Sequence, residues 1–266
     1  QMKIHFFTNI SHELRTPLTL LVSLLEDLLK QENTDASTHE MYTLMHRNVE
    51  RLKSMIDQLL EFRKIEEGLL HLEVVETDLV RFFKNIAIAF RDLARHRNIQ
   101  FSFVSSVEEL KAWVDRDLLE KMLFNLLSNA FKYSDDHGQI LMKLDCNEQQ
   151  VVFSLEDNGI GIPSEEMPHI FEQFYRARSS QHGNRRQGTG IGLALTKSIV
   201  ELHKGSIEAY SIINRGSVFV VKLPLGSSHF PPEVLKLYYR DPEDSDHYPY
   251  DQNTKLVDTP QEELIQ

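Results

Sequence analysis

Residues 6–18 of the chain read FFTNISHELRTPL, with His12 at the centre. Apolar side chains recur at spacings of three and four from this stretch onward, which predicts an amphipathic helix over residues 1–31. At about 100° per residue, His12 lies roughly opposite the apolar stripe. The sequence therefore predicts a histidine that is displayed to solvent. The stripe consists of Phe7, Ile10, Leu14, Leu18, Leu21, Leu25 and Leu28.

The neighbours of His12 suggest a chemical role for it. Glu13 follows directly and is placed to orient the imidazole or to accept its proton. Thr16 lies one helical turn later, so its hydroxyl shares the face of His12. Pro17 cannot donate a hydrogen bond to the carbonyl of Glu13, and we expect the helix to bend there. Taken alone, a surface histidine on a kinked helix would be the ordinary explanation.

Length and composition restrict the classes of function. The chain has 266 residues and a formal net charge of −11, which argues against a general surface for nucleic acids or anionic membranes. Its single cysteine, Cys146, excludes an intrachain disulfide and fits a reducing compartment. The most apolar stretch, residues 18–29, is too short and too often interrupted by polar side chains to span a membrane. We expect a soluble protein without direct nucleic-acid contacts.

A second helix follows the first after a short polar connection. Residues 31–37 are turn-prone, residues 38–66 are again amphipathic, and Gly68 is placed to end the helix. The apolar surface of residues 18–29 is wider than one partner helix covers, and each large side chain left in water forfeits about 1.5–3 kcal/mol. Two hairpins that form a four-helix bundle would bury it. The sequence therefore predicts a homodimer through residues 1–67.

Residues 68–225 alternate between strand-like and helix-like segments, which predicts an α/β two-layer sandwich. From residue 226 to residue 266 the periodicity is lost, and the composition is acidic and contains proline, as in a linker or a loosely docked tail. The predicted fold class is thus a multidomain α+β chain. Strands are expected at 70–75, 99–104, 140–144, 151–155, 206–213 and 217–223, and helices at 79–96, 115–133 and 189–203.

The segment NLLSNAFKY, residues 125–133, places polar side chains on one face of a predicted helix. Asn125, Asn129 and Lys132 lie within about 60° of one another. An amide oxygen suits Mg²⁺, and an ammonium group suits phosphate. By itself this pattern is more often a plain solvated face.

Two glycine runs follow. In EDNGIGIP, residues 156–163, Asp157 can accept a hydrogen bond from a base, and the glycines allow a ligand to approach the backbone. In GTGIGLAL, residues 188–195, the helix N-terminus that follows favours a polyphosphate. The spacing G-x-G-x-G is neither that of dinucleotide folds nor that of a P-loop. Each run is a weak signal alone.

Together and in this order, the motifs resemble the H, N, G1, F and G2 boxes of sensor histidine kinases. The F-box is FEQFYR at residues 171–176. The resemblance covers residues 1–224 and implies a Bergerat-type ATP-binding fold, a left-handed βαβ sandwich shared with DNA gyrase and heat-shock chaperones. It implies that ATP and Mg²⁺ bind here and that His12 accepts the phosphate.

The resemblance also implies roles for individual residues. Asn129 would coordinate Mg²⁺ with Asn125 close by, and Asp157 would hydrogen-bond the adenine amino group. The segment 176–187 would form a mobile lid, in which the sequence does not choose among Arg178, Arg185 and Arg186 as the contact to the γ-phosphate. The remaining nucleotide-binding residues would be Lys132, Tyr133, Gly159, Gly161, Gly188, Thr189, Gly190 and Gly192.

These roles imply a mechanism. His12 would attack the γ-phosphate in line while Glu13 orients the ring, and the phosphoryl group would then pass to an aspartate of a response-regulator receiver domain. Glu13 and Thr16 also match the family pattern that supports dephosphorylation of the receiver. Gyrase-like ATPases place a water-activating glutamate where this chain has Asn125, which favours transfer over hydrolysis.

The tail resembles the segment that joins kinase to receiver in hybrid two-component sensors of Bacteroides-like bacteria. That resemblance implies the cytoplasmic portion of an inner-membrane sensor, with a receiver fused C-terminally. The chain also opens within a helical pattern, so we expect an upstream part. Two alternatives remain: a degenerate module that only binds nucleotide and dimerises, and a gyrase- or chaperone-type ATPase.

Overall fold

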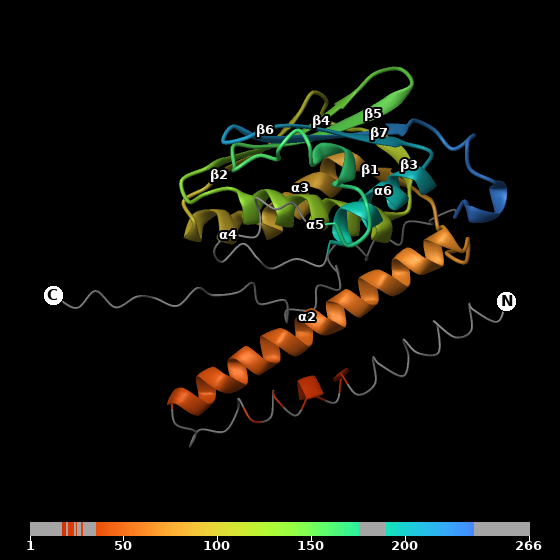
Figure 1. Ribbon diagram of the computed structural model, residues 1–266. Coiled ribbons are helices and arrows are strands. Elements are labelled where there is room, and N and C mark those ends of the chain that lie inside the picture. The colour runs from red at the N-terminus through yellow and green to blue at the C-terminus, as the bar shows by residue number, and fades with distance from the viewer. Residues whose placement is uncertain are drawn as a thin grey trace.

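The computed structural model describes residues 36–175 and 190–236, together with residues 18, 19, 21–23, 25 and 28. Its longest element is the helix α2 (Ala36–Glu66), which lies beneath an α/β domain in Figure 1. His12, Glu13 and Thr16 lie outside the described residues.

The end of α2 follows the prediction. Gly68 adopts a positive φ of 66°, and its N–H donates to the carbonyl of Ile65. The N–H groups of Leu69 and Leu70 both donate to the carbonyl of Lys64, at 2.8 and 3.2 Å. These bonds satisfy carbonyls that the last turn of a helix leaves free.

The described positions between residues 18 and 28 are helical, as predicted. Leu18, Val22 and Leu25 are buried, whereas Leu21 is 47% exposed. The spacing of four and three places the buried side chains on one stripe. One face of this segment is therefore covered and another is open.

The α/β domain contains a five-stranded sheet in the order β2-β4-β5-β7-β6 and a two-stranded sheet of β1 and β3. The pair β2–β4 is parallel, and the other pairs are antiparallel. The strands are β1 (Val75–Asp78), β2 (Gln100–Ser105), β3 (Lys111–Val114), β4 (Gln139–Cys146), β5 (Gln150–Asp157), β6 (Ser206–Ile212) and β7 (Gly216–Pro224).

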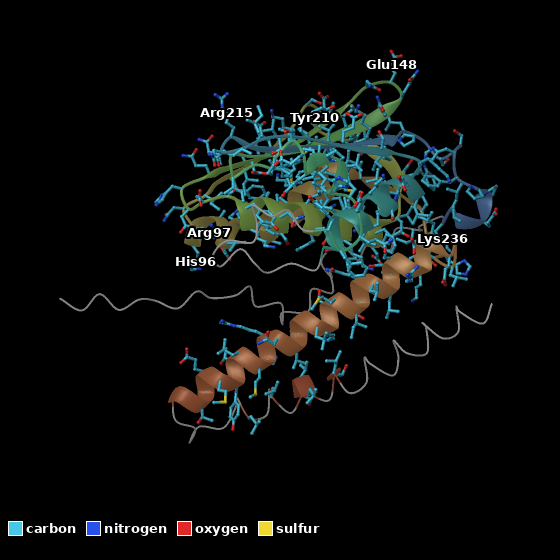
Figure 2. The ribbon with its side chains drawn as sticks, viewed as in Figure 1. His96, Arg97, Glu148, Tyr210, Arg215 and Lys236 are labelled. Carbon is cyan, nitrogen blue, oxygen red and sulfur yellow. The ribbon has the colours of Figure 1, made fainter. Side chains whose placement is uncertain are left out.

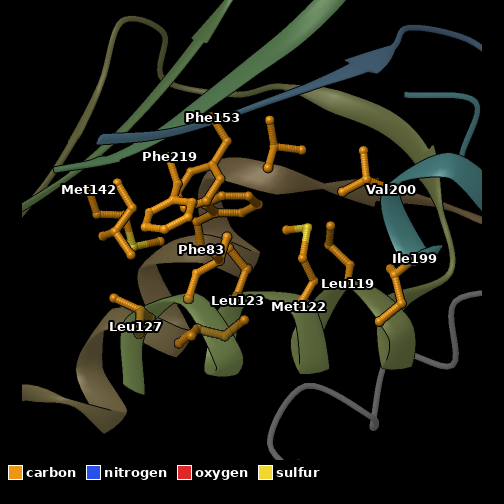
Figure 3. Packing of buried hydrophobic residues seen from close by; sticks show 14 of the residues in the cluster. Phe83, Leu119, Met122, Leu123, Leu127, Met142, Phe153, Ile199, Val200 and Phe219 are labelled. Carbon is orange, nitrogen blue, oxygen red and sulfur yellow. The ribbon is translucent and has the colours of Figure 1, made fainter. Parts of the chain in front are cut away.

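Helices cover one face of the large sheet, so the domain has two layers (Figure 1). Figure 3 shows the core between them, where Phe83 lies against Phe153 and above Leu123. The rings of Phe83 and Phe153 meet edge to face, with centroids 5.0 Å apart. This confirms the predicted α/β sandwich. The helices are α3 (Leu79–Ala89), α4 (Arg91–His96), α5 (Arg116–Tyr133) and α6 (Gly192–Leu202).

Two predicted elements were wrong in part. The single helix expected at residues 79–96 is broken at Phe90, whose ring is buried and stacks on Phe131 with centroids 5.4 Å apart. The strand expected at residues 70–75 is instead β1, which begins at Val75. In both places tertiary packing overrides a local pattern.

Two further differences are smaller. The strand β3 was not predicted, and α6 begins three residues later than expected.

Residues 226–236 pack on the α/β domain. Phe230 is 5% exposed, and a 3-10 turn, η4 (Pro232–Val234), follows it. Residues 237–266 lie outside the described part. None of the helices in the described ranges is both long and apolar enough to cross a membrane.

Candidate functional site

The helix α5 carries the first part of the candidate site. Asp115 caps it by accepting the N–H of Leu118 at 3.1 Å, as predicted. One face of α5 is buried under the sheet, which leaves Asn125 and Asn129 half-buried on its side. The Nδ2 of Asn125 donates to the carbonyl of Gly192 at 3.5 Å. The asparagine helix and the glycine run that opens α6 therefore meet.

The last turn of α5 contacts the other glycine loop. The carbonyl of Tyr133 accepts the N–H of Ile160 at 3.1 Å, and a Cβ added at Gly159 would lie 2.3 Å from that same carbonyl. Only glycine therefore permits this approach. The Nζ of Lys132 lies 4.7 Å from the centroid of the Tyr133 ring. Both side chains are half-buried beside the loop, where the sequence placed them.

Asp157 ends β5 and is only 7% exposed. Its Oδ1 accepts the N–H of Gly159 at 2.9 Å. Burial raises the pKa of this carboxyl to about 6, and the charge of Glu156 acts in the same direction, while the N–H groups of Gly159 and Ser217 oppose the shift. A buried carboxyl with spare acceptor capacity and a perturbed pKa is typical of a binding site.

Two serines that sequence reasoning missed lie next to this carboxyl, and one of them bonds it through its backbone N–H. The Oγ of Ser211 donates to the carbonyl of Gly216 at 2.8 Å, accepts the N–H of Ile162 at 2.8 Å and lies 3.0 Å from the Oγ of Ser217. Ser217 in turn donates its N–H to Asp157. The signal in the sequence was faint, since it consisted of a serine directly after the turn glycine Gly216.

The backbone at two glycines fixes how these loops meet. Gly161 has a φ of 67°, and a Cβ there would lie 2.1 Å from the carbonyl of Ile212. Gly190 has a φ of 73°, and its carbonyl accepts the N–H of Phe174 at 2.9 Å. The glycine run thus packs on the FEQFYR segment. Gly188, Thr189, Arg178, Arg185 and Arg186 lie outside the described residues.

The residues present fit a cation that a nucleotide brings with it. Within residues 36–175 and 190–236 no three His, Cys, Asp or Glu side chains gather as a metal site. Mg²⁺ commonly takes one or two protein oxygens and completes its shell with phosphates and water. The half-buried amides of Asn125 and Asn129 on α5 suit that kind of shell.

Comparisons with known proteins agree with this geometry. Residues 2–68 match the family "His Kinase A (phospho-acceptor) domain". Residues 114–227 match "Histidine kinase-, DNA gyrase B-, and HSP90-like ATPase".

Similar proteins carry related names. "Histidine kinase P4" of Formosa agariphila is 35% identical over 231 residues, which cover 86% of this chain and 17% of that protein. "Sensor histidine kinase WalK" of Bacillus subtilis is 33% identical over 231 residues, covering 84% and 37%. The chain thus spans a minor part of these curated relatives.

Solved structures share the fold. The catalytic domain of histidine kinase ThkA is 28% identical with a TM-score of 0.52, covering 58% of this chain and 99% of that one. Full-length ShkA in complex with AMPPNP is 22% identical with a TM-score of 0.72, covering 84% and 46%. The chain belongs to the histidine kinase family and is a catalytic core in which a phospho-acceptor domain precedes the ATPase domain.

Proposed function

We propose that this chain transfers the γ-phosphate of ATP to His12 and then to an aspartate of a response-regulator receiver domain. The observation that carries the proposal is that α5 meets both glycine runs: Asn125 contacts Gly192, and Tyr133 contacts Gly159, whose N–H is bonded to the buried Asp157. A site with an amide face, a buried carboxyl and two close glycine loops suits a purine nucleotide with its phosphates.

Each described residue has a defined task in this proposal. The ionised carboxyl of Asp157 accepts a hydrogen bond from the adenine amino group, held in place by the N–H groups of Gly159 and Ser217. Lys132 attracts the phosphates, and the backbone at Gly190 and Gly192 approaches them. Asn129, with Asn125 beside it, would hold Mg²⁺, which neutralises charge on the phosphates when it is bound.

The acceptor side of the reaction rests on the phospho-acceptor domain. Neutral His12 is the nucleophile, and Glu13 orients the ring and accepts its proton. Asn125 is no general base, so water is not activated at that position. Thr16, together with Glu13, would support removal of phosphate from the receiver. One of Arg178, Arg185 and Arg186 would stabilise the transferring phosphoryl group.

The assembly around this core is part of the same proposal. The hairpin of residues 1–67 would pair with a second copy, and the acidic tail would lead towards a receiver in a membrane-anchored hybrid sensor. A histidine kinase–response regulator complex is known for ThkA with TrrA. In the present chain, support for the dimer comes from the open apolar face of α2, on which Leu44 is 52% exposed.

The test is incubation with Mg-ATP labelled at the γ-phosphate. We expect the intact chain to acquire an acid-labile, alkali-stable label that His12→Gln abolishes. His39→Gln, on the exposed face of α2, is the matched control and should be labelled like the unaltered protein. A label that survives His12→Gln would refute the choice of acceptor.

Two further outcomes separate the alternatives. Steady release of inorganic phosphate by His12→Gln would favour a gyrase-like ATPase. Nucleotide binding without any label would favour a module that binds ATP but does not transfer its phosphate. Binding is measured with a fluorescent ATP analogue, so that the two results are independent.

A further inference from the structure

The segment of residues 226–236, here called the C-terminal strap, is folded onto the α/β domain although it lies almost wholly beyond the matched ATPase region, which ends at residue 227. Phe230 anchors it. This ring is 5% exposed and meets the ring of His203 edge to face, with centroids 6.2 Å apart. The centroid of the His229 ring lies 4.1 Å from that of Phe230.

The strap also binds the linker that connects α2 to the domain. The N–H of Val74 donates to the carbonyl of Val234 at 2.9 Å, and the N–H of Lys236 donates to the carbonyl of Val74 at 2.8 Å. Val74 is fully buried and forms a parallel bridge with Leu235. Figure 2 shows Lys236 close to the C-terminal end of α2. Backbone pairing on both sides of Val74 fixes its position.

One residue, Asp115, connects this linker to the two helices of the nucleotide site, through its carboxyl and its backbone N–H. The Oδ2 of Asp115 accepts the N–H of Glu73 at 3.0 Å, while its Oδ1 caps α5. The N–H of Asp115 donates to Nε2 of His203 at 3.0 Å. The Nδ1 of His203 lies 2.8 Å from the carbonyl of Ile199, to which it donates in α6. The neutral ring therefore uses both nitrogens to join α5 to α6.

These contacts make the connection between the hairpin and the site short. On the hairpin side, Leu70 is still bonded to Lys64 of α2. On the domain side, Glu73 and Val74 are bonded to Asp115 and to the strap. His71 and Leu72 lie between the two anchors. A short tether raises the effective concentration of the tethered groups, which falls as about the −3/2 power of tether length.

We propose that Phe230 is a positioning residue for phosphoryl transfer. Its ring seats the C-terminal strap on His203, and the strap in turn holds Val74. The tether between the hairpin and the nucleotide site is thereby kept short. This inference rests on the proposed function. When the strap is released, the bond from Glu73 to Asp115 is the only one of these domain-side anchors that is left, and residues 71–74 become the tether whenever that bond opens. We expect phosphoryl transfer to slow by about two- to fivefold, while ATP binds as before.

The experiment compares three substitutions in the full chain. Phe230→Ala removes the anchor, Phe230→Leu keeps an apolar group in the same place, and Glu233→Ala changes an exposed strap residue as the control. We expect Phe230→Ala to lower the rate of His12 phosphorylation at saturating ATP by about two- to fivefold. The KM for ATP should stay within about twofold of that of the unaltered chain. Phe230→Leu should restore most of the rate, and Glu233→Ala should not change it.

Amide hydrogen exchange gives a readout that does not need phosphoryl transfer. In Phe230→Ala the N–H groups of Val74 and Lys236 should exchange faster, while those in the middle of α5 stay protected. If Phe230→Ala does not fold, Leu235→Ala, at a half-buried position beside Val74, serves in its place.

Three results would overturn the inference. An unchanged rate with faster exchange at Val74 would mean that the strap is anchored by Phe230 but positions nothing. A KM for ATP that rises in step with the lost rate would mean that the strap only supports the nucleotide site. An unaltered chain that takes up no phosphate would refute the proposed function and the positioning role with it, whereas the first two results refute the positioning role alone.

Discussion

The helices α2 and α5 are both amphipathic, yet the structure uses their apolar faces in opposite ways. α5 buries eight side chains in the core of its own domain. Among the described side chains of α2, a helix of 31 residues, Phe62 alone is buried. Large apolar groups along the rest of α2 stay open, namely Met41 at 52%, Leu44 at 52%, Met45 at 46% and Leu52 at 45% exposed.

The difference separates a self-contained unit from one that needs a partner. The α/β domain closes its core within one chain, because four helices cover one face of a five-stranded sheet. Along the described part of α2 large apolar groups stay open, and each such leucine or methionine forfeits about 1.5–3 kcal/mol of burial. Stability of the domain should therefore depend on core residues, whereas stability of the hairpin should depend on a second copy.

The largest effect should follow from opening the core of the self-contained unit. Phe83→Ala removes a fully buried ring that packs on Phe153, and we expect it to lower the free energy of unfolding of the domain by about 3–5 kcal/mol. Urea denaturation monitored by circular dichroism measures this. Ile88→Ala, at a 48% exposed position on the same helix, should change the free energy by less than about 0.5 kcal/mol. Similar losses for both would contradict the closed core.

The next effect concerns the open face of α2. Leu44→Asp places two charges in the expected dimer interface, one from each copy, and should weaken dimerisation by about 3 kcal/mol, or about 100-fold in Kd. Sedimentation equilibrium measures this. Ile212→Asp, at a 62% exposed position on β6, is the control and should leave the dimer intact. An unaffected dimer in Leu44→Asp would place the partner elsewhere.

A smaller effect in the opposite direction, a gain of stability, is expected on substitution of Asp157, because its buried charge destabilises the folded domain. The pKa of its carboxyl is raised from 3.8 to about 6, which means that the folded domain favours the protonated form. The free energy of unfolding therefore has its full value below about pH 4, where the carboxyl is protonated in both states, and it falls as the pH rises through about 6. This difference in pKa between the unfolded and the folded protein corresponds to about 3 kcal/mol of free energy of unfolding at neutral pH. We expect Asp157→Asn to raise the free energy of unfolding by about 1–3 kcal/mol at pH 7, and not at pH 4.

Denaturation with urea at both pH values tests this, with Glu148→Gln at an exposed position away from Asp157 as the control. The same Asp157→Asn substitution should weaken ATP binding at least about tenfold, because the acceptor for the adenine amino group loses its charge. A variant that is destabilised at pH 7 would mean that the charged form is well solvated in the folded protein.

The sequence was sufficient for the parts of the molecule in which a local pattern and the tertiary structure agree. Asp115 before an amphipathic run predicted the start of α5, and Gly68 predicted the end of α2. Asn125 lies beside Gly192, and Asp157 lies beside Gly159. The chemistry of these residues follows from their types and spacing, and both can be read from the sequence.

Contacts between distant segments were not predictable in the same way. The pairing of Val74 with Leu235 joins residues about 160 positions apart, and neither has a distinctive neighbour. Phe90 breaks a helix because its ring has a place on Phe131, which a periodic pattern does not reveal. Ser211 and Ser217 are ordinary strand residues until the sheet register sets them side by side.

The smallest effect is expected where the two regions touch. Glu61 of α2 pairs with Lys121 of α5, and Glu66 accepts a hydrogen bond from Nε2 of Gln173 at 3.1 Å. These groups are partly open to water, and such pairs contribute about 0.2–1 kcal/mol. A double-mutant cycle with Glu61→Gln and Lys121→Met, measured by urea denaturation, should give a coupling energy below about 1 kcal/mol that decreases further with added salt.

Weak coupling between α2 and α5 would allow the α/β domain to move while the hairpin stays paired with a second copy. If the polar pairs are this weak, parting the domain from α2 costs mainly the burial of Phe62, about 1.5–3 kcal/mol, while the tether at residues 71–72 holds the domain nearby. A coupling energy above about 2 kcal/mol that is insensitive to salt would instead mean that α2 and the α/β domain move as one rigid unit.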